Sequence, residues 1–99
     1  MNITITARKF KAHDSLKSFI NGELDNLKKI NDDILDVDVI LSYQNHRENI
    51  KSAELVVMVP GQTITATESS DDFKKSVSAS VEKVIRQLKK LKTRRTARA

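Results

Sequence analysis

Apolar residues alternate with polar ones along two short stretches of this chain, which is the pattern of a strand with one buried face. In residues 2–7, Ile3, Ile5 and Ala7 occupy every second position, and residues 36–43 alternate in the same way. Two further strands are expected over residues 52–59 and over residues 63–68, which are rich in β-branched side chains, with Pro60 and Gly61 as a tight turn between them.

Two longer segments repeat an apolar residue every three or four positions, as a helix with one buried stripe does. We expect Asp14 or Ser15 to cap the first helix, and the polar segment 69–72 to open the second. Gly22 lies inside the first helix, where we expect it to allow a close approach to a neighbouring element. The expected stripes are Leu16, Phe19, Ile20, Leu24, Leu27 and Ile30 in the first helix and Phe73, Val77, Val81, Val84, Leu88 and Leu91 in the second.

The resulting order, β-α-β-β-β-α, predicts an α+β domain. A helical crossover makes the first two strands parallel, and short loops make the later neighbours antiparallel, so we expect a four-stranded mixed sheet with both helices packed on one face. We expect one domain over residues 1–92 and a disordered basic tail over residues 93–99. The other sheet face would carry polar side chains, namely Thr4, Thr6, Asp36, Asp38, Glu54, Thr63 and Thr65.

Composition excludes several classes of function. The chain has no cysteine, which rules out a disulfide framework, a thiolate metal site and a cysteine nucleophile. His13 and His46 are the only histidines and fall on different predicted loops, and the paired aspartates fall at element boundaries, where aspartate commonly caps helices and turns. We therefore expect no enzymatic activity, no metal and no cofactor. No apolar run has the length of a signal peptide or a membrane span, which predicts a soluble, cytoplasmic protein.

Positive charge is concentrated near the C-terminus. Residues 82–99 contain four lysines and four arginines against one glutamate, a net charge of +7, whereas the whole chain carries +5. The preceding 81 residues therefore carry −2. An asymmetry of this kind is typical of a surface that binds a polyanion, most often a nucleic acid.

Helical periodicity gathers part of this charge on one face of the second helix. Lys83, Arg86 and Lys90, with Arg94 if the helix continues, lie away from the apolar stripe, so a duplex or folded RNA would lie along them. The competing interpretation is a solvated lysine-rich face, which usually mixes in acids; after Glu82 there are none. Small side chains that would let a phosphate backbone approach border the same face, namely Ser76, Ala79 and Ser80.

Two smaller groups of cations accompany the helix. One follows the first strand and continues to Lys17, and the other is Lys28 with Lys29; all three groups are expected to border a shared groove, although solvation explains the smaller two equally well. The candidate RNA-binding residues are Arg8, Lys9, Lys11, Lys75, Lys83, Arg86, Lys89, Lys90 and Arg94.

The aromatic residues bear on which nucleic acid is expected. Phe19 and Phe73 fall on the apolar stripes and Tyr43 continues the buried side of its strand, so Phe10 is the one ring that the pattern leaves exposed. Single-strand binders stack bases on exposed rings. The sequence therefore favours recognition of the backbone and shape of a folded RNA.

Several segments resemble the ribosome hibernation promoting factors, also described as ribosome-associated inhibitor or protein Y-like proteins. The resemblance covers nearly the whole chain, from MNITITARKF through DSLKSFINGELDNLKKI and DVDVILS to AELVVMVPGQTITATESSDDF and VEKVIRQLKKLK. Lys74 stands where the family often has an aromatic residue. The most specific positions are Asp72, Lys83, Arg86, Gln87, Leu88, Lys89, Lys90 and Lys92.

The resemblance implies a fold similar to double-stranded-RNA-binding domains and a stress or stationary-phase factor that regulates translation. Such a factor binds the small ribosomal subunit in the channel of messenger and transfer RNA and inhibits translation by occupancy. It implies contacts with ribosomal RNA by Lys83, Arg86, Lys90, Arg8 and Lys9, and no membrane or small-molecule substrate. Longer relatives carry a further domain that pairs two ribosomes, so we do not expect this shorter chain to pair ribosomes by itself. The pattern shows no obvious exposed apolar patch, so we expect a monomer.

Two other functions stay open at this point. Leu88 and Leu91 with their flanking lysines also fit an interaction module that docks on an acidic protein or an anionic membrane surface. A duplex-DNA binder is the third alternative, weakened because no groove-reading motif is recognised and the basic helix needs its apolar side for the core.

Overall fold

The computed structural model describes the backbone of residues 1–44 and 50–98 and the side chains of residues 1–43 and 50–91. The predicted order of elements, β-α-β-β-β-α, is confirmed. The elements are β1 (Asn2–Ala7), α1 (Asp14–Ile30), β2 (Asp36–Gln44), β3 (Ile50–Val59), β4 (Gln62–Ser70) and α2 (Phe73–Arg98).

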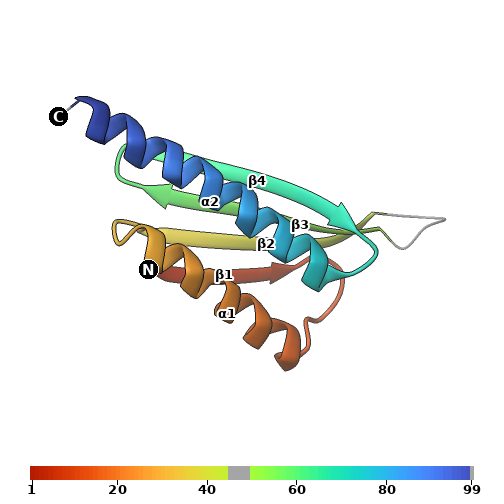
Figure 1. Cartoon of the computed structure of the whole chain (residues 1–99). Coiled ribbons are helices and arrows are strands. Elements are labelled where there is room, and N and C mark those ends of the chain that lie inside the picture. Colours follow the sequence, from red (N-terminus) through yellow and green to blue (C-terminus); the bar gives the residue numbers. More distant parts are fainter. Residues whose placement is uncertain (45–49, 99) are drawn as a thin grey trace.

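The four strands form one mixed sheet in the order β1-β2-β3-β4. β1 pairs with β2 in parallel, and β2 with β3 and β3 with β4 pair antiparallel, as the crossover and the short loops predicted. Pro60 and Gly61 join β3 to β4, and Gly61 adopts a φ of 79°, a conformation that residues with a Cβ rarely adopt. Figure 1 shows both helices on the same side of this sheet, each starting at the end of the sheet where β1 and β4 finish.

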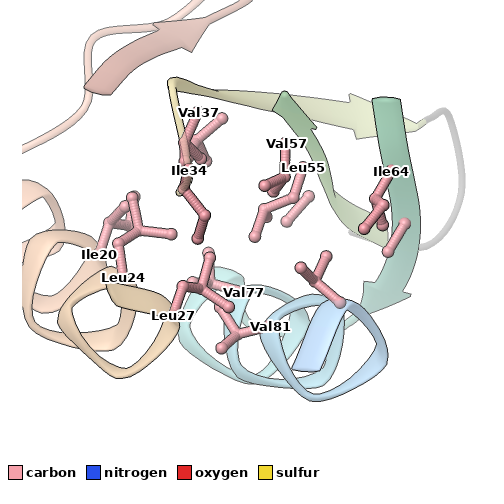
Figure 2. Close-up of a cluster of buried hydrophobic side chains, with 14 of the residues drawn as sticks. Ile20, Leu24, Leu27, Ile34, Val37, Leu55, Val57, Ile64, Val77 and Val81 are labelled. Carbon is pink, nitrogen blue, oxygen red and sulfur yellow. The ribbon is translucent and has the colours of Figure 1, made fainter. Parts of the chain in front are cut away.

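The hydrophobic core fills the space between the sheet and the two helices. The register aligns one inward-facing residue from each strand, as in the row Ile3, Val37, Val57 and Ile64. Figure 2 shows side chains of α1 and α2 pointing toward the inward residues of the strands. The predicted stripes are buried at Ile20, Leu24 and Leu27 of α1 and at Phe73, Val77, Val81, Val84 and Leu88 of α2.

The opposite sheet face has no covering layer within the described residues, and its expected polar side chains lie there. The threonines of the edge strands β1 and β4 are exposed, whereas Asp36, Asp38 and Glu54 in the middle strands are half-buried. Ile40 and Val56 share this face and are also half-buried. The protein therefore presents an acidic sheet surface on one side and the helices on the other.

Three local expectations were wrong. His13 occupies the N-cap of α1 and makes no side-chain capping hydrogen bond, so neither Asp14 nor Ser15 is the cap. The expected opening of α2 by the segment 69–72 was wrong for Ser69 and Ser70, which belong to β4, and right for Asp72. Asp72 caps α2, since its Oδ1 accepts a hydrogen bond from the backbone N–H of Lys74 at 3.3 Å.

Gly22 is the third case. It is exposed, and a Cβ added there would meet nothing within 4 Å, so no neighbouring element approaches it closely. At the C-terminus, α2 continues as a helix to Arg98 and so enters the segment 93–99; the domain boundary at residue 92 stays a prediction.

Candidate nucleic-acid interface

Two buried serines hold α2 on the sheet. The Ser76 hydroxyl donates a hydrogen bond to the carbonyl of Lys51 at 2.6 Å, and the Ser80 hydroxyl lies 2.9 Å from the carbonyl of Ala53, both on β3. Ser76 and Ser80 are 1% and 0% exposed. They therefore anchor the underside of the helix, and the prediction that they border a phosphate-accessible face was wrong; Ala79, the third member, is half-buried.

The outward side of α2 carries the exposed residues Lys83, Arg86 and Lys90, which we call the α2 basic strip. Two contacts show that the strip leans toward β4. Lys83 Nζ lies 2.7 Å from Glu68 Oε1, and Gln87 Nε2 donates to the carbonyl of Thr65 at 3.3 Å. The expectation of a face without acids therefore holds for the residues of α2 alone. It fails for the surface around the helix, because Glu68 of β4 pairs with Lys83.

The remaining predicted cations of α2 have different settings. Lys75, in the first turn, forms an exposed ion pair with Asp71 at 3.3 Å. Lys89 is exposed and Arg94 lies beyond the described side chains. On the α1 side of the helix, the exposed Lys74 places its Nζ 5.6 Å from the centre of the Phe19 ring, so this lysine reaches across to α1.

The turn after β1 holds Arg8, Lys9 and Lys11, all exposed. Lys9 adopts a φ of 63°, the left-handed conformation that non-glycine residues seldom adopt, and thereby reverses the chain after the strand. The backbone N–H of Arg8 donates to Leu41 at 2.9 Å, which places this turn at the β1 edge of the sheet.

The predicted shared groove is not formed. The α2 basic strip leans over β4 and the Arg8 turn follows β1, and these strands are opposite edges of the sheet. Lys28 and Lys29 lie in the last turn of α1, at the end of that helix remote from the Arg8 turn, beside Asp25 and Asp32. Three separate groups of lysines and arginines therefore replace the single groove, and two aspartates accompany the group at the end of α1.

The aromatic side chains differ most from expectation. Tyr43 is 52% exposed although it lies on the helix-covered side of β2, whereas Phe10 is half-buried. The three rings of Phe10, Tyr43 and Phe73 contact one another, with centroids 5.0 to 5.3 Å apart. Lys51, which the sequence did not single out, is paired with Tyr43 in the sheet, and its Nζ lies 6.0 Å from the Tyr43 ring centre.

Sequence reasoning missed Tyr43 because alternation alone assigns it to the buried side. The pairing of β1 with β2 ends at Ala7 and Leu41, one inward position before Tyr43, so no strand flanks the ring on that side. The only signal in the sequence is the shorter length of the first predicted strand compared with the second.

Other kinds of site find little support in the described part of the chain. No group of three or more potential metal-binding side chains occurs among these residues. None of the helices that the structure describes is long and apolar enough to cross a membrane. His46 falls in the segment 45–49, outside the described residues.

A comparison with protein families adds to this geometry. The family model of sigma 54 modulation protein / S30EA ribosomal protein matches residues 3–96, which is nearly the whole chain. The chain belongs to the S30EA family. Membership agrees with the predicted resemblance to protein Y-like proteins, and the family and its structural relatives are ribosome-associated proteins. A comparison with curated protein sequences gives no match.

Solved structures of the S30EA fold superpose closely on this chain. A ribosomal subunit interface protein from Coxiella burnetii is 27% identical, with a TM-score of 0.84 over 94% of this chain and 99% of the other. The N-terminal domain of protein Y from Thermus thermophilus is 24% identical, with a TM-score of 0.82 over 92% of this chain and 99% of the other, and shares the fold.

Proposed function

We propose that this protein binds the small ribosomal subunit through ribosomal RNA, in the channel used by messenger and transfer RNA, and inhibits translation by occupying it. The observation that carries this proposal is the α2 basic strip, exposed on a helix that buried serines and a continuous apolar stripe hold rigidly. Membership in the S30EA family and the likeness to a ribosomal subunit interface protein support the choice of the ribosome as partner.

The mechanism needs no covalent chemistry. Cations on a rigid helix bind phosphates by releasing condensed counterions, so affinity depends on position and charge. A folded protein bound in the channel excludes its normal RNA ligands sterically. In this proposal the protein is a cytoplasmic hibernation factor of stress or stationary phase, acting as a monomer without a cofactor.

Co-sedimentation with purified small subunits tests the proposal. We expect saturable, near-stoichiometric binding that messenger and transfer RNA compete away. If about five phosphates are contacted, affinity will fall about 100-fold between 50 and 200 mM salt. Binding that never saturates, or that ignores both ligands, would contradict occupancy of the channel.

Two variants with equal changes in charge locate the contact. Arg86→Gln with Lys90→Gln removes two cations of the α2 basic strip, and Lys28→Gln with Lys29→Gln removes two from α1. All four side chains are exposed, so both variants should fold normally. The first pair should weaken subunit binding at least tenfold and the second only slightly; equal losses would mean that net charge, and not this strip, determines binding.

A further inference from the structure

The corner where β1 ends and β2 continues holds an exposed aromatic ring among cations. Arg8, Lys9, Ser42 and Tyr43 line a pocket of about 300 Å³ there, and none of these four residues is acidic. The α2 basic strip lies over the opposite edge of the sheet, so this corner is a separate surface.

The Tyr43 ring is held in place but not covered. Phe10 and Phe73 each contact it edge to face, at 5.1 and 5.3 Å and at interplanar angles of 72° and 77°. Phe10 and Phe73 stack on each other at 5.0 Å and form a rigid base for it. Fixing a ring in advance removes most of the conformational entropy that a stacking partner would otherwise lose on binding.

Lys51 lies at the outer limit of a cation–π contact with this ring, 6.0 Å from its centre, and 5.8 Å from the centre of Phe73. A long lysine side chain held this weakly is able to move to a phosphate when another planar group takes its place. Arg8 and Lys9, which line the pocket with Tyr43, are two further cations that a phosphate could reach there.

We propose that Tyr43, with Arg8, Lys9 and Lys51, forms a subsite that stacks one unpaired RNA base and binds the phosphates beside it. The inference deepens the proposed function, since it assumes that RNA is the ligand. Among the described residues, the charged side chains beside the exposed ring are the cations Arg8, Lys9 and Lys51. This setting fits a base attached to phosphates, because base stacking and charge neutralisation then act on the same nucleotide. A duplex keeps its bases stacked internally and would gain only the charge contacts.

The intrinsic fluorescence of the protein can report the stacking of a base on Tyr43. Tyr43 is its single tyrosine and it has no tryptophan, so tyrosine fluorescence reports on this ring alone. We expect a short unpaired RNA to quench this fluorescence saturably, after correction for absorption by the RNA. The same strand annealed to its complement should quench far less at equal concentration.

Variants separate stacking from charge. Tyr43→Leu keeps an apolar side chain against Phe10 and Phe73 but removes the ring, and should weaken binding of labelled unpaired RNA about 5- to 150-fold. Tyr43→Trp should bind at least as well as the original protein. Phe19→Leu, at a half-buried ring on α1, is the matched control and should leave this affinity unchanged.

Lys9→Gly tests the contribution of the Lys9 charge to RNA binding in a variant that should keep its fold. Glycine adopts the positive φ of this position readily, so the variant should be at least as stable as the original while binding unpaired RNA more weakly. If Tyr43→Leu does not fold, the Lys9→Gly variant and the tyrosine fluorescence of the unchanged protein still test the proposal.

Failure of this inference is distinguishable from failure of the proposed function. Absent quenching, equal quenching by duplex and single strand, or unchanged affinity in a folded Tyr43→Leu variant would overturn the stacking site, even where small-subunit binding persists. Conversely, quenching by unpaired RNA in a protein that does not bind small subunits would support the stacking site and overturn the proposed function.

Discussion

Single contacts decide which cations are available to a phosphate. Lys83 was predicted as a principal RNA ligand, yet its ammonium lies 2.7 Å from the Glu68 carboxylate. The side chains of this pair are 48% and 29% exposed, so solvent screens the interaction and it contributes less than about 1 kcal/mol to stability. Lys83 thus pairs with β4, and under the proposed function it has to exchange Glu68 for a phosphate.

Replacing Glu68 by glutamine should therefore strengthen RNA binding. The amide keeps the shape of the carboxylate but loses its charge, so Lys83 no longer has to leave an ion pair. We expect higher affinity for small subunits, a steeper salt dependence by about one unit of the log–log slope, and a change in stability under about 1 kcal/mol. Salt titration and urea unfolding measure these quantities; an unchanged slope would mean that Lys83 does not contact phosphate.

Among the elements, α2 combines an interior side that fixes its position with an exterior side that carries the α2 basic strip. The apolar stripe from Phe73 to Leu88 sets which side faces the sheet. Ser76 and Ser80 fix the position of α2 along β3, because their hydroxyls lie within hydrogen-bond distance of the carbonyls of Lys51 and Ala53. The α2 basic strip is therefore held at a fixed position over β4.

Replacing Ser80 by alanine tests this anchoring. The change removes a buried hydroxyl that lies 2.9 Å from the carbonyl of Ala53 on β3 and 2.9 Å from the carbonyl of Ser76 within α2, and should lower the free energy of unfolding by about 1 kcal/mol. Ser18→Ala, at an exposed position of α1, is the matched control and should be neutral or slightly stabilising. Equal results from urea unfolding of the two variants would show that the Ser80 hydroxyl does not anchor the helix.

Across the whole molecule, charge is separated from the core. Among the described side chains, the last buried core position is Leu88, with Leu91 partly buried against the core. Residues 93–99 add three arginines to the sequence. The open sheet face is acidic and the helix side basic, so the protein should approach an RNA surface with α2 foremost.

A chain ending at Lys92 should keep its stability within about 0.5 kcal/mol and bind small subunits more weakly at every salt concentration. The salt slope should fall by up to about three units, one for each arginine removed that contacts phosphate. If the segment contributes only charge, a full-length variant with Arg94, Arg95 and Arg98 replaced by glutamine should show the same weaker binding and the same lower salt slope. A marked loss of stability in the shortened chain alone would place the segment inside the folded domain and contradict the boundary at residue 92.

The order of elements, the mixed sheet and nearly all of the core were predictable, because periods of two and of three to four are local properties of the chain. Element ends were less predictable. Ser69 and Ser70 are good capping residues by type, but pairing with β3 keeps both in β4. The positive surface of α2 was also predictable, since it needs only the helical period and the position of the stripe.

Sequence by itself therefore determined the fold class, the interior side of each element and the placement of net charge at one end. Only the tertiary structure decided how surface residues from distant segments combine. It paired Lys83 with Glu68, placed the Arg8 turn and the α2 basic strip at opposite edges of the sheet, and left Tyr43 exposed because β1 ends one inward position before it. Each of these depends on where two elements end relative to each other, which no local period records.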